Sequence, residues 1–287
     1  TTSTGNYNIN TTINYTNPGT EFREWKEKNN KVLEVRSPNL LEITIVEIPG
    51  NLTRGQEYNF SVYANNTADF VSNDVWLNYT LPSGWTNSSG NLTQNNETLC
   101  PSCLLWNNIT VSISLSSTLG SNEVRLDSSS QEGQEDWKTK VVYVWANTSL
   151  IDFQSSDPTP NREETIQLQA KLIYDDGSPV SNQNVSFYDE TEDKFIDWDL
   201  TDSSGIAIIS YTISSNAPLG EHTLNVTYAG SSSVFTHSSS NTTTINVGAL
   251  PTITDVEAIP ENQGYGYNVT IRANVTDEDG VDTVIAK

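Results

Sequence analysis

Apolar and polar residues alternate with a period of two along most of this chain, and no convincing helical pattern of any length appears. For example, Leu224, Val226 and Tyr228 would share one side of an extended strand. Asn225 and Thr227, which lie between them, would share the other side and face water. A chain with this pattern builds its core from sheets, so the expected fold class is all-β.

Ten alternating runs predict strands, and clusters of Gly, Pro, Asn, Asp and Ser separate them as turns. Short strands at this spacing indicate antiparallel β-sandwiches. The predicted strands cover residues 41–48, 57–64, 74–81, 105–115, 139–145, 164–174, 205–212, 222–228, 242–247 and 267–275.

Proline-bearing linkers divide the chain into units. Pro158 and Pro160 follow a first strand near residues 150–153, and Pro251 opens another first strand. A unit of ~40 residues supplies two or three strands, whereas a sandwich of this kind needs about seven. The expected units are therefore two complete sandwiches, 36–147 and 148–248, and two partial ones, 1–35 and 249–287.

The partial units predict how copies of the chain could join. Residues 24–35 echo residues 136–144, the last strand of the first complete sandwich. Residues 1–35 of one copy would then complete the sandwich that begins at 249 in the next copy, by strand addition. The alternative is that the chain is a segment of a longer protein with repeated units. The predicted subunit contacts are the alternating residues Tyr7, Ile9, Ile13 and Tyr15.

Asn-x-Ser/Thr sequons are about twice as frequent as the composition predicts. With 32 Asn and 67 Ser plus Thr in 287 residues, chance gives about 7.5, and 16 are present, none with proline in the middle. An N-glycan is bulky and hydrophilic, so its acceptor implies export and a surface position. The alternative is that a chain rich in these residues forms sequons by accident. The predicted N-glycosylation sites are Asn10, Asn14, Asn51, Asn59, Asn65, Asn78, Asn87, Asn91, Asn96, Asn108, Asn147, Asn184, Asn225, Asn241, Asn268 and Asn274.

Net charge and hydropathy limit which ligands and which cellular locations are compatible with this chain. The 14 Lys plus Arg against 36 Asp plus Glu give a net charge of −22, which argues against nucleic acid and anionic membranes as ligands. No apolar stretch of about 18 residues is present, so we expect no membrane span. The start of the sequence has no basic and then apolar leader, which predicts a mature or excised chain. The expected location is extracellular, at a cell surface.

The two cysteines, Cys100 and Cys103, are separated by Pro and Ser. A pair at this spacing can form a small disulfide loop, half of a metal site or a redox centre. Oxidising conditions outside cells favour a disulfide between Cys100 and Cys103 that closes a hairpin tip. Free thiols, metal binding and redox chemistry are the alternatives.

Two stretches resemble extracellular families. Residues 54–85 contain RGQEYNFSV, an Asn-Asn turn and LPSGW, and are similar to the CARDB-like Ig-like adhesion modules of archaeal and bacterial surface proteins. Residues 177–224 contain GSPV, NVSF, TDSSGIA and LGEHTL, and resemble bacterial-type Ig-like domains of adhesins and S-layer proteins. The resemblance implies tandem immunoglobulin-like sandwiches in an archaeal surface glycoprotein, and it specifies fold better than function.

Acidic turns are the candidate metal sites. Asp277, Asp279 and Asp282 offer oxygen ligands of the type that Ca²⁺ prefers. The alternative is an Asp-Gly turn without metal, because the spacing is not that of an EF-hand. Two further acidic runs, 175–177 and 189–193, are expected to be a hairpin turn and a solvated loop.

Catalytic motifs are absent from the sequence. There is no Gly-x-Ser-x-Gly, and among 36 acidic residues a pair of carboxylates carries little information. His222 and His237 are expected on surface strands or loops. We therefore expect no enzyme, and no cofactor beyond covalent N-glycans and the calcium considered above.

Tryptophans divide into two expected groups. Trp76, Trp106 and Trp145 lie in alternating strands and are expected in the core, whereas Trp25 and Trp85 lie in turn-rich surroundings. Trp25 and Trp85 are therefore the candidates for contacts with sugar or other subunits.

The pattern as a whole predicts a structural glycoprotein of an archaeal cell surface, part of a filament, sheath or S-layer, whose partners are copies of itself. Two alternatives belong to other classes. One is an adhesin or a carbohydrate- or protein-binding module, and the other is the non-catalytic stalk of a secreted enzyme.

Overall fold

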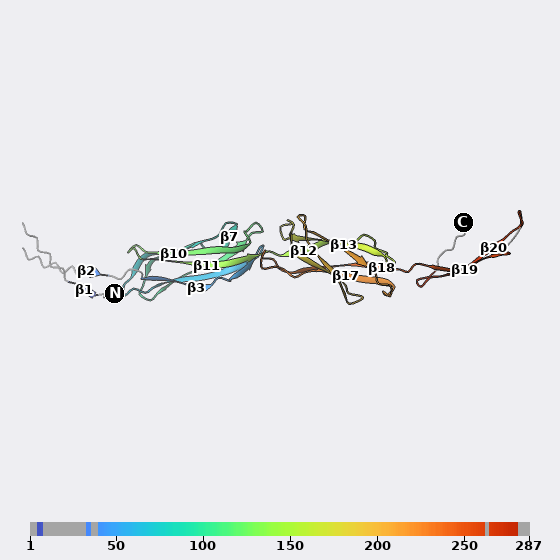
Figure 1. Cartoon of the computed structure of the whole chain (residues 1–287). Helices are drawn as coiled ribbons and strands as arrows, with labels where there is room; N and C mark the ends of the chain where they lie inside the picture. The colour runs from blue at the N-terminus through green and yellow to red at the C-terminus, as the bar shows by residue number, and fades with distance from the viewer. Residues whose placement is uncertain (1–4, 8–32, 36–39, 262–263, 281–287) are drawn as a thin grey trace, which may run out of the picture.

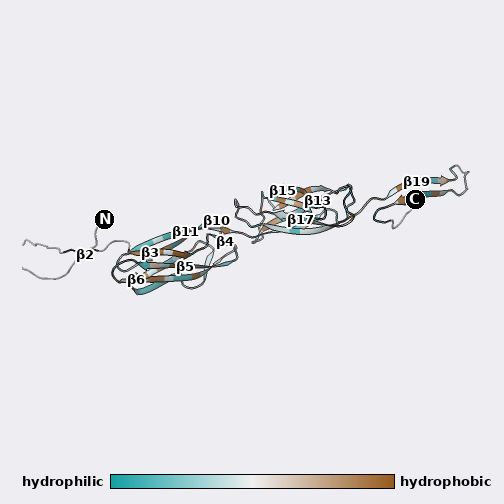
Figure 2. Cartoon of the chain, turned by 90° about the horizontal axis from the view of Figure 1, so that it is seen from below, coloured by the Kyte–Doolittle hydropathy of each residue, from teal (hydrophilic) through white to brown (hydrophobic). Residues whose placement is uncertain are grey.

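The computed structural model describes residues 5–7, 33–35, 40–261 and 264–280, and every regular element in these ranges is a β-strand. Two sandwiches lie end to end and form an elongated molecule, with a two-stranded sheet beyond each of them (Figures 1 and 2). The fold is all-β, in tandem β-sandwiches, as the alternation predicts. No helix in these ranges has the length and hydropathy of a membrane span.

The first sandwich consists of two sheets. Its strands are β3 (Leu41–Glu47), β4 (Asn51–Thr53), β5 (Glu57–Asn66), β6 (Ser72–Thr80), β7 (Trp85–Ser89), β8 (Thr93–Leu99), β9 (Leu104–Ile113), β10 (Gly120–Ser129) and β11 (Glu135–Trp145). One sheet has the order β3-β5-β9-β7 and the other β4-β11-β10-β6-β8. All neighbouring pairs are antiparallel except β4 and β11, which run parallel.

The second sandwich is smaller. Its strands are β12 (Thr148–Ser155), β13 (Thr165–Tyr174), β14 (Asn184–Asp189), β15 (Lys194–Leu200), β16 (Ile206–Thr212), β17 (Gly220–Tyr228) and β18 (Ser239–Val247). One sheet has the order β12-β13-β16 and the other β15-β14-β17-β18, with antiparallel pairing throughout.

Each sandwich has a hydrophobic core of its own, built from the inward half of the alternation. In β5, Phe60, Val62 and Ala64 are buried while the residues between them face outward. The same alternation runs through β13 and β17. All ten predicted strands are present, with ends that differ by a few residues. β8 was not predicted because its sequence, TQNNETL, is polar except for the last residue, Leu99, and it forms the edge of its sheet.

The remaining sheets have two strands each. β1 (Gly5–Tyr7) pairs antiparallel with β2 (Leu33–Val35), and β19 (Thr252–Ile259) pairs antiparallel with β20 (Thr270–Thr276). A two-stranded sheet is marginally stable by itself in water, so an additional partner would stabilise each of them.

Candidate functional site

The linker between the sandwiches is only two residues long, Ala146 and Asn147, and its backbone is hydrogen-bonded. The Ala146 N–H donates to the Phe235 carbonyl at 2.9 Å, and the Ala146 carbonyl accepts from the His237 N–H at 3.0 Å. The Asn147 N–H donates to a carboxylate oxygen of Asp175 at 3.0 Å. The linker is therefore held as a short β-bridge against the second sandwich.

An aromatic side chain from the second sandwich packs against the end of the first. Phe235 stacks on Tyr143, with ring centroids 5.9 Å apart, and meets Trp145 edge-on at 5.5 Å. The ring also lies over Gly120, where an added Cβ would come within 2.8 Å of it. The backbone of Gly120 has a φ of +84°, so glycine suits both the space and the turn. This contact fixes the position of the loop that carries Phe235.

A buried arginine crosses the same joint. Arg54 follows β4 and has only 6% of its side chain exposed. Its guanidinium forms an ion pair with Asp175, lies 3.3 Å from Asp176, and donates to the Leu115 carbonyl at 2.7 Å. The guanidinium also lies 5.7 Å above the Tyr174 ring, where a cation–π attraction adds to the ion pairs. Both carboxylates belong to the turn after β13, which is the predicted hairpin turn.

These contacts make the joint an interface with defined geometry. Domains in one chain usually move relative to one another unless an extensive or specific interface prevents it. Here a backbone bridge, a stacked aromatic ring and a buried ion pair act together. Sequence reasoning missed the joint, although Phe235 stands out in the sequence as an aromatic residue within SSSVFTHSSS, a serine-rich loop.

A second junction connects the second sandwich with β19 and β20. Arg162 forms an ion pair with Glu278, and the Ala249 N–H donates to a carboxylate oxygen of Asp279 at 3.0 Å. The hydrogen bond from Ala249 is the main reason that the pKa of Asp279 is lowered, and a hydrogen bond with Asp279 raises the pKa of Asp277. Asp279 therefore ties the turn after β20 to the linker.

Calcium binding at this turn stays a prediction. Asp277 and Asp279 are near each other, and Asp282 lies outside the described residues. Within the described ranges, no three His, Cys, Asp or Glu side chains are arranged to hold a metal ion.

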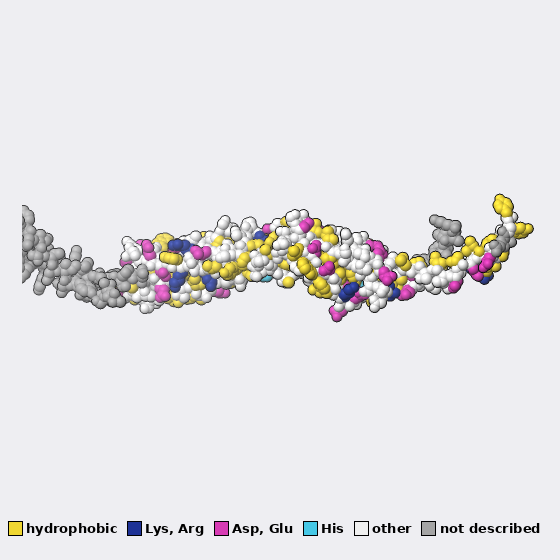
Figure 3. Space-filling model, viewed as in Figure 1, with side chains coloured by type: hydrophobic (Ala, Val, Ile, Leu, Met, Phe, Trp, Pro, Cys, Tyr) yellow, Lys and Arg dark blue, Asp and Glu magenta, His cyan; other side chains and the backbone are white. Residues whose placement is uncertain are grey.

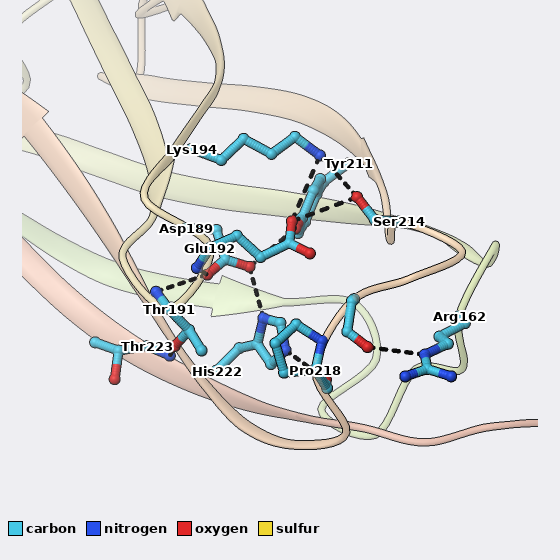
Figure 4. A network of polar contacts seen from close by, with 11 residues as sticks. Arg162, Asp189, Thr191, Glu192, Lys194, Tyr211, Ser214, Pro218, His222 and Thr223 are labelled. Atoms are coloured by element: carbon cyan, nitrogen blue, oxygen red, sulfur yellow. Dashed lines mark hydrogen bonds and ion pairs between the residues drawn. The ribbon is translucent and has the colours of Figure 1, made fainter. Parts of the chain in front are cut away.

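The acidic run 189–193 is only partly a solvated loop, because Glu190 and Asp193 are exposed whereas Asp189 and Glu192 belong to a buried polar network (Figure 4). Asp189, at the end of β14, is fully buried. One of its oxygens accepts the N–H groups of Thr191 and Glu192, at 2.9 and 3.1 Å. The other accepts the Tyr211 hydroxyl at 2.9 Å and lies 2.7 Å from His222 Nδ1.

His222 is fully buried, so its predicted surface position is wrong. It lies on the face of β17 that carries the core residues, and Asp189 balances its charge there. Its Nε2 is 2.8 Å from the Pro218 carbonyl, so both ring nitrogens face oxygens that can only accept. Two acceptors that face the ring nitrogens favour the imidazolium form, in which each nitrogen carries a hydrogen. Neither is available as a base for an outside substrate. His237, in contrast, is exposed at the joint.

The unfolding free energy of the second sandwich is expected to fall as the pH rises above 6.5, the ordinary pKa of histidine. Burial opposes protonation, but hydrogen bonds to Asp189 and Pro218 outweigh it and raise the pKa of His222 above its ordinary value of 6.5. The stabilisation is therefore complete below pH 6.5 and is lost as the pH rises through the folded-state pKa, at about 1.4 kcal/mol per unit of separation. Urea titrations from pH 5 to 9 would measure it, and His222→Gln should lack this decline.

The predicted glycosylation sites are compatible with attached sugar. Asn10 and Asn14 lie outside the described residues, and none of the other fourteen sequon asparagines is buried. Asn51, Asn59, Asn91 and Asn108 are exposed, as is Asn147 in the linker.

The described tryptophans of both groups are placed differently from the prediction. Trp76 and Trp106 are 47% and 45% exposed, and Trp145 is half-buried at the joint. Trp85 is buried in the core, where its ring lies 6.2 Å from that of Phe60. Trp25 lies outside the described residues. The tryptophans on alternating strands occupy the outer phase of the alternation, which periodicity alone does not distinguish from the inner phase.

The predicted disulfide lies at the end of the first sandwich distant from the joint. Cys100 and Cys103 form a disulfide in the turn between β8 and β9. Of the four predicted subunit contacts, Tyr7 lies in β1, and Ile9, Ile13 and Tyr15 lie outside the described residues.

Comparison with known proteins gives a weak structural likeness. No protein-family model and no curated protein sequence matches the chain. Among solved structures, the chain is similar to the D0-D1 domain of intimin, with a TM-score of 0.26 and 15% identity, over 71% of this chain and 97% of that one. It is also similar to the adhesin InvE of Yersinia pseudotuberculosis, with a TM-score of 0.28 and 14% identity, over 72% of this chain and 59% of that one. At these scores the likeness carries no argument about function.

Proposed function

We propose that this chain is a structural, N-glycosylated protein of the outer surface of an archaeal cell, forming part of a filament, sheath or S-layer. The observation that carries the proposal is the joint, in which a two-residue linker, Phe235 and Arg54 hold two sandwiches in line. A rod with a fixed joint suits a structural element better than a flexible tether. Glycans on its outer strands would block pairing with other sheets.

Copies of the chain would join head to tail through β19 and β20. Alternate residues of this hairpin are apolar and exposed, and Ile253 and Ile271, at 61% and 66% exposed, lie on the same face. The opposite face carries Asn274 and Arg272. Figure 3 shows hydrophobic side chains gathered along the hairpin. A face of this kind is half of a sandwich interior, and residues 1–35 of a second copy would cover it. Such a contact does not close on itself, so it grows a fibre.

Charge on the apolar face is expected to prevent end-to-end assembly. Ile253→Lys would place an ammonium group in the proposed interface, where burial without a partner is costly. Thr254→Lys is the matched control, because it adds the same charge at the next position of β19 on the opposite face. Sedimentation velocity of the glycosylated protein would measure the polymer. Deleting residues 1–16 should also abolish it, and unchanged polymer in that deletion variant would rule out strand addition.

Electron cryo-microscopy of the glycosylated protein tests the wider proposal. Regular fibres or lattices are the expected result, whereas isolated rods would indicate a stalk or adhesin segment. An adhesin that binds its ligand through Trp85 would need this ring to be exposed beside an unglycosylated groove. Trp85 is in the core, and a surface hollow of about 370 Å³ in the same sandwich is lined by two sequon asparagines, Asn59 and Asn108. Sugar on either asparagine would stand at the edge of that hollow and hinder access to it.

A further inference from the structure

Aromatic residues are concentrated at one position relative to the sequons. Five of the sixteen sequons have an aromatic residue two positions before the asparagine. Sixteen sequons multiplied by the aromatic fraction, 26 of 287, gives about 1.4 by chance. Four of the five are tryptophans, from only seven in the chain. The five are Tyr63, Trp76, Trp85, Trp106 and Trp145.

The strand geometry gives this spacing a physical meaning. Residues i and i+2 of a strand project from the same face, so an aromatic ring at this position stands beside the asparagine. Trp76 and Trp106 are nearly half exposed on outer faces, and Tyr63 is half-buried on one. Trp85 and Trp145 differ, because their rings pack in the core and at the joint.

Two of the three outer rings form a pair. Tyr63 of β5 lies directly opposite Trp106 of β9, with ring centroids 4.9 Å apart. Because the strands are antiparallel, Asn65 lies beyond Tyr63 in one direction and Asn108 lies beyond Trp106 in the opposite direction. The result is one platform of two rings with a sequon at each end.

Two of these asparagines accept a hydrogen bond at the side-chain oxygen, which fixes the orientation of the carboxamide. Asn108 accepts from Ser61 at 2.6 Å, and Asn78 accepts from Thr93 at 2.6 Å. Their nitrogens, to which a glycan would be attached, make no hydrogen bond to any described residue. In contrast, the side-chain nitrogen of Asn225 donates to Glu190 at 2.6 Å, and residue 223, two positions before it, is not aromatic.

We propose that these three outer rings are stacking platforms for the first sugar of the N-glycan attached two residues further along the strand. A pyranose ring presents a face of C–H groups, which can cover an aromatic ring and remove its apolar surface from water. Such stacking explains why the solvent-facing sides of these strands carry large exposed aromatic rings. The inference rests on the N-glycosylation in the proposed function. The ring–asparagine pairs are Tyr63–Asn65, Trp76–Asn78 and Trp106–Asn108.

The test uses the full chain, secreted from a eukaryotic host and trimmed enzymatically to one N-acetylglucosamine per occupied site. In NMR spectra, the sugar-ring protons on Asn108 should shift upfield because they lie over the Trp106 ring, and Trp106→Val should abolish the shift. Asn59 is the matched control, since it lies on the neighbouring strand β5, opposite Thr110 of β9, and has Glu57 two positions before it. Its sugar protons should resemble those of a free glycopeptide.

Thermal unfolding gives an independent readout. The sugar on Asn108 should raise the midpoint for the first sandwich by roughly 4 °C when Trp106 is present, and by much less in Trp106→Val. Asn108→Gln, with and without Trp106→Val, completes the double-mutant cycle.

The possible outcomes distinguish a failure of the stacking hypothesis from a failure of glycosylation at these sites. Mass spectrometry that finds no sugar on Asn65, Asn78 or Asn108 would overturn the platform together with glycosylation at these sites. Sugar that is present on Asn108, with unshifted protons and the same stabilisation in Trp106→Val, would overturn the platform alone.

Discussion

Asp189→Ala is expected to destabilise the second sandwich by about 3–5 kcal/mol, the cost of removing one partner of a buried ion pair. The variant leaves the buried imidazolium of His222 without its anion, and the Tyr211 hydroxyl without its acceptor. A loss of this size is a large part of the roughly 5–15 kcal/mol that stabilises a typical domain. Urea denaturation followed by circular dichroism would measure it.

Asp202→Ala is the matched control for this variant. Asp202 also accepts two backbone N–H groups of its turn, those of Ser204 at 2.7 Å and Ile206 at 2.9 Å, but it is exposed and has no histidine partner. We expect a cost of about 1 kcal/mol there, as for a lost turn or cap hydrogen bond. Equal costs for the two variants would contradict a stabilising role for the buried pair.

Arg54→Ala is expected to weaken the joint by about 3 kcal/mol, because Asp175 would remain largely buried without its cation. The sandwiches should each stay folded, since Arg54 belongs to neither hydrophobic core. The change should therefore appear in small-angle scattering, as a shorter and broader distribution of end-to-end distances, and in calorimetry, as less coupled unfolding of the two sandwiches.

Arg125→Ala is the comparison for this second prediction. Arg125 pairs with Asp127 within β10, and both side chains are well exposed, so solvent screens the pair and it adds little to stability. We expect no change in scattering for this variant. If Arg54→Ala leaves the scattering profile as unchanged as Arg125→Ala does, the ion pair does not hold the joint.

The fold was largely predictable from the sequence because alternation is a local signal. Phe60, Val62 and Ala64 are separated by one residue each, and that spacing requires no knowledge of what lies opposite. Edge strands such as β8 were not predicted because they bury few side chains. Two central strands, β10 and β14, were also not among the ten predicted strands, although both alternate buried and outward residues. Trp85 was misplaced for a related reason. It follows Gly84, whose φ of +82° turns the chain and directs the ring from a turn-rich segment into the core.

The joint could not be predicted because its contacts connect residues far apart in sequence. Arg54 and Asp175 are separated by 121 positions, and nothing near either residue identifies the other. The buried pair of His222 and Asp189 has the same difficulty. The sequon asparagines were easier to identify, since their motif is complete within three residues, and the aromatic residue that precedes some of them is only two positions away.

The parallel pairing of β4 with β11 has a mechanical consequence. These strands meet at the joint, where Tyr143, Val144 and Trp145 lie opposite Asn51, Leu52 and Thr53. Pulling the two sandwiches apart would draw Trp145 along the strand axis, across hydrogen bonds that lie roughly perpendicular to the force. The bonds would then bear the load together in shear instead of opening one after another. A chain of such units would transmit tension along its length while each sandwich stayed closed.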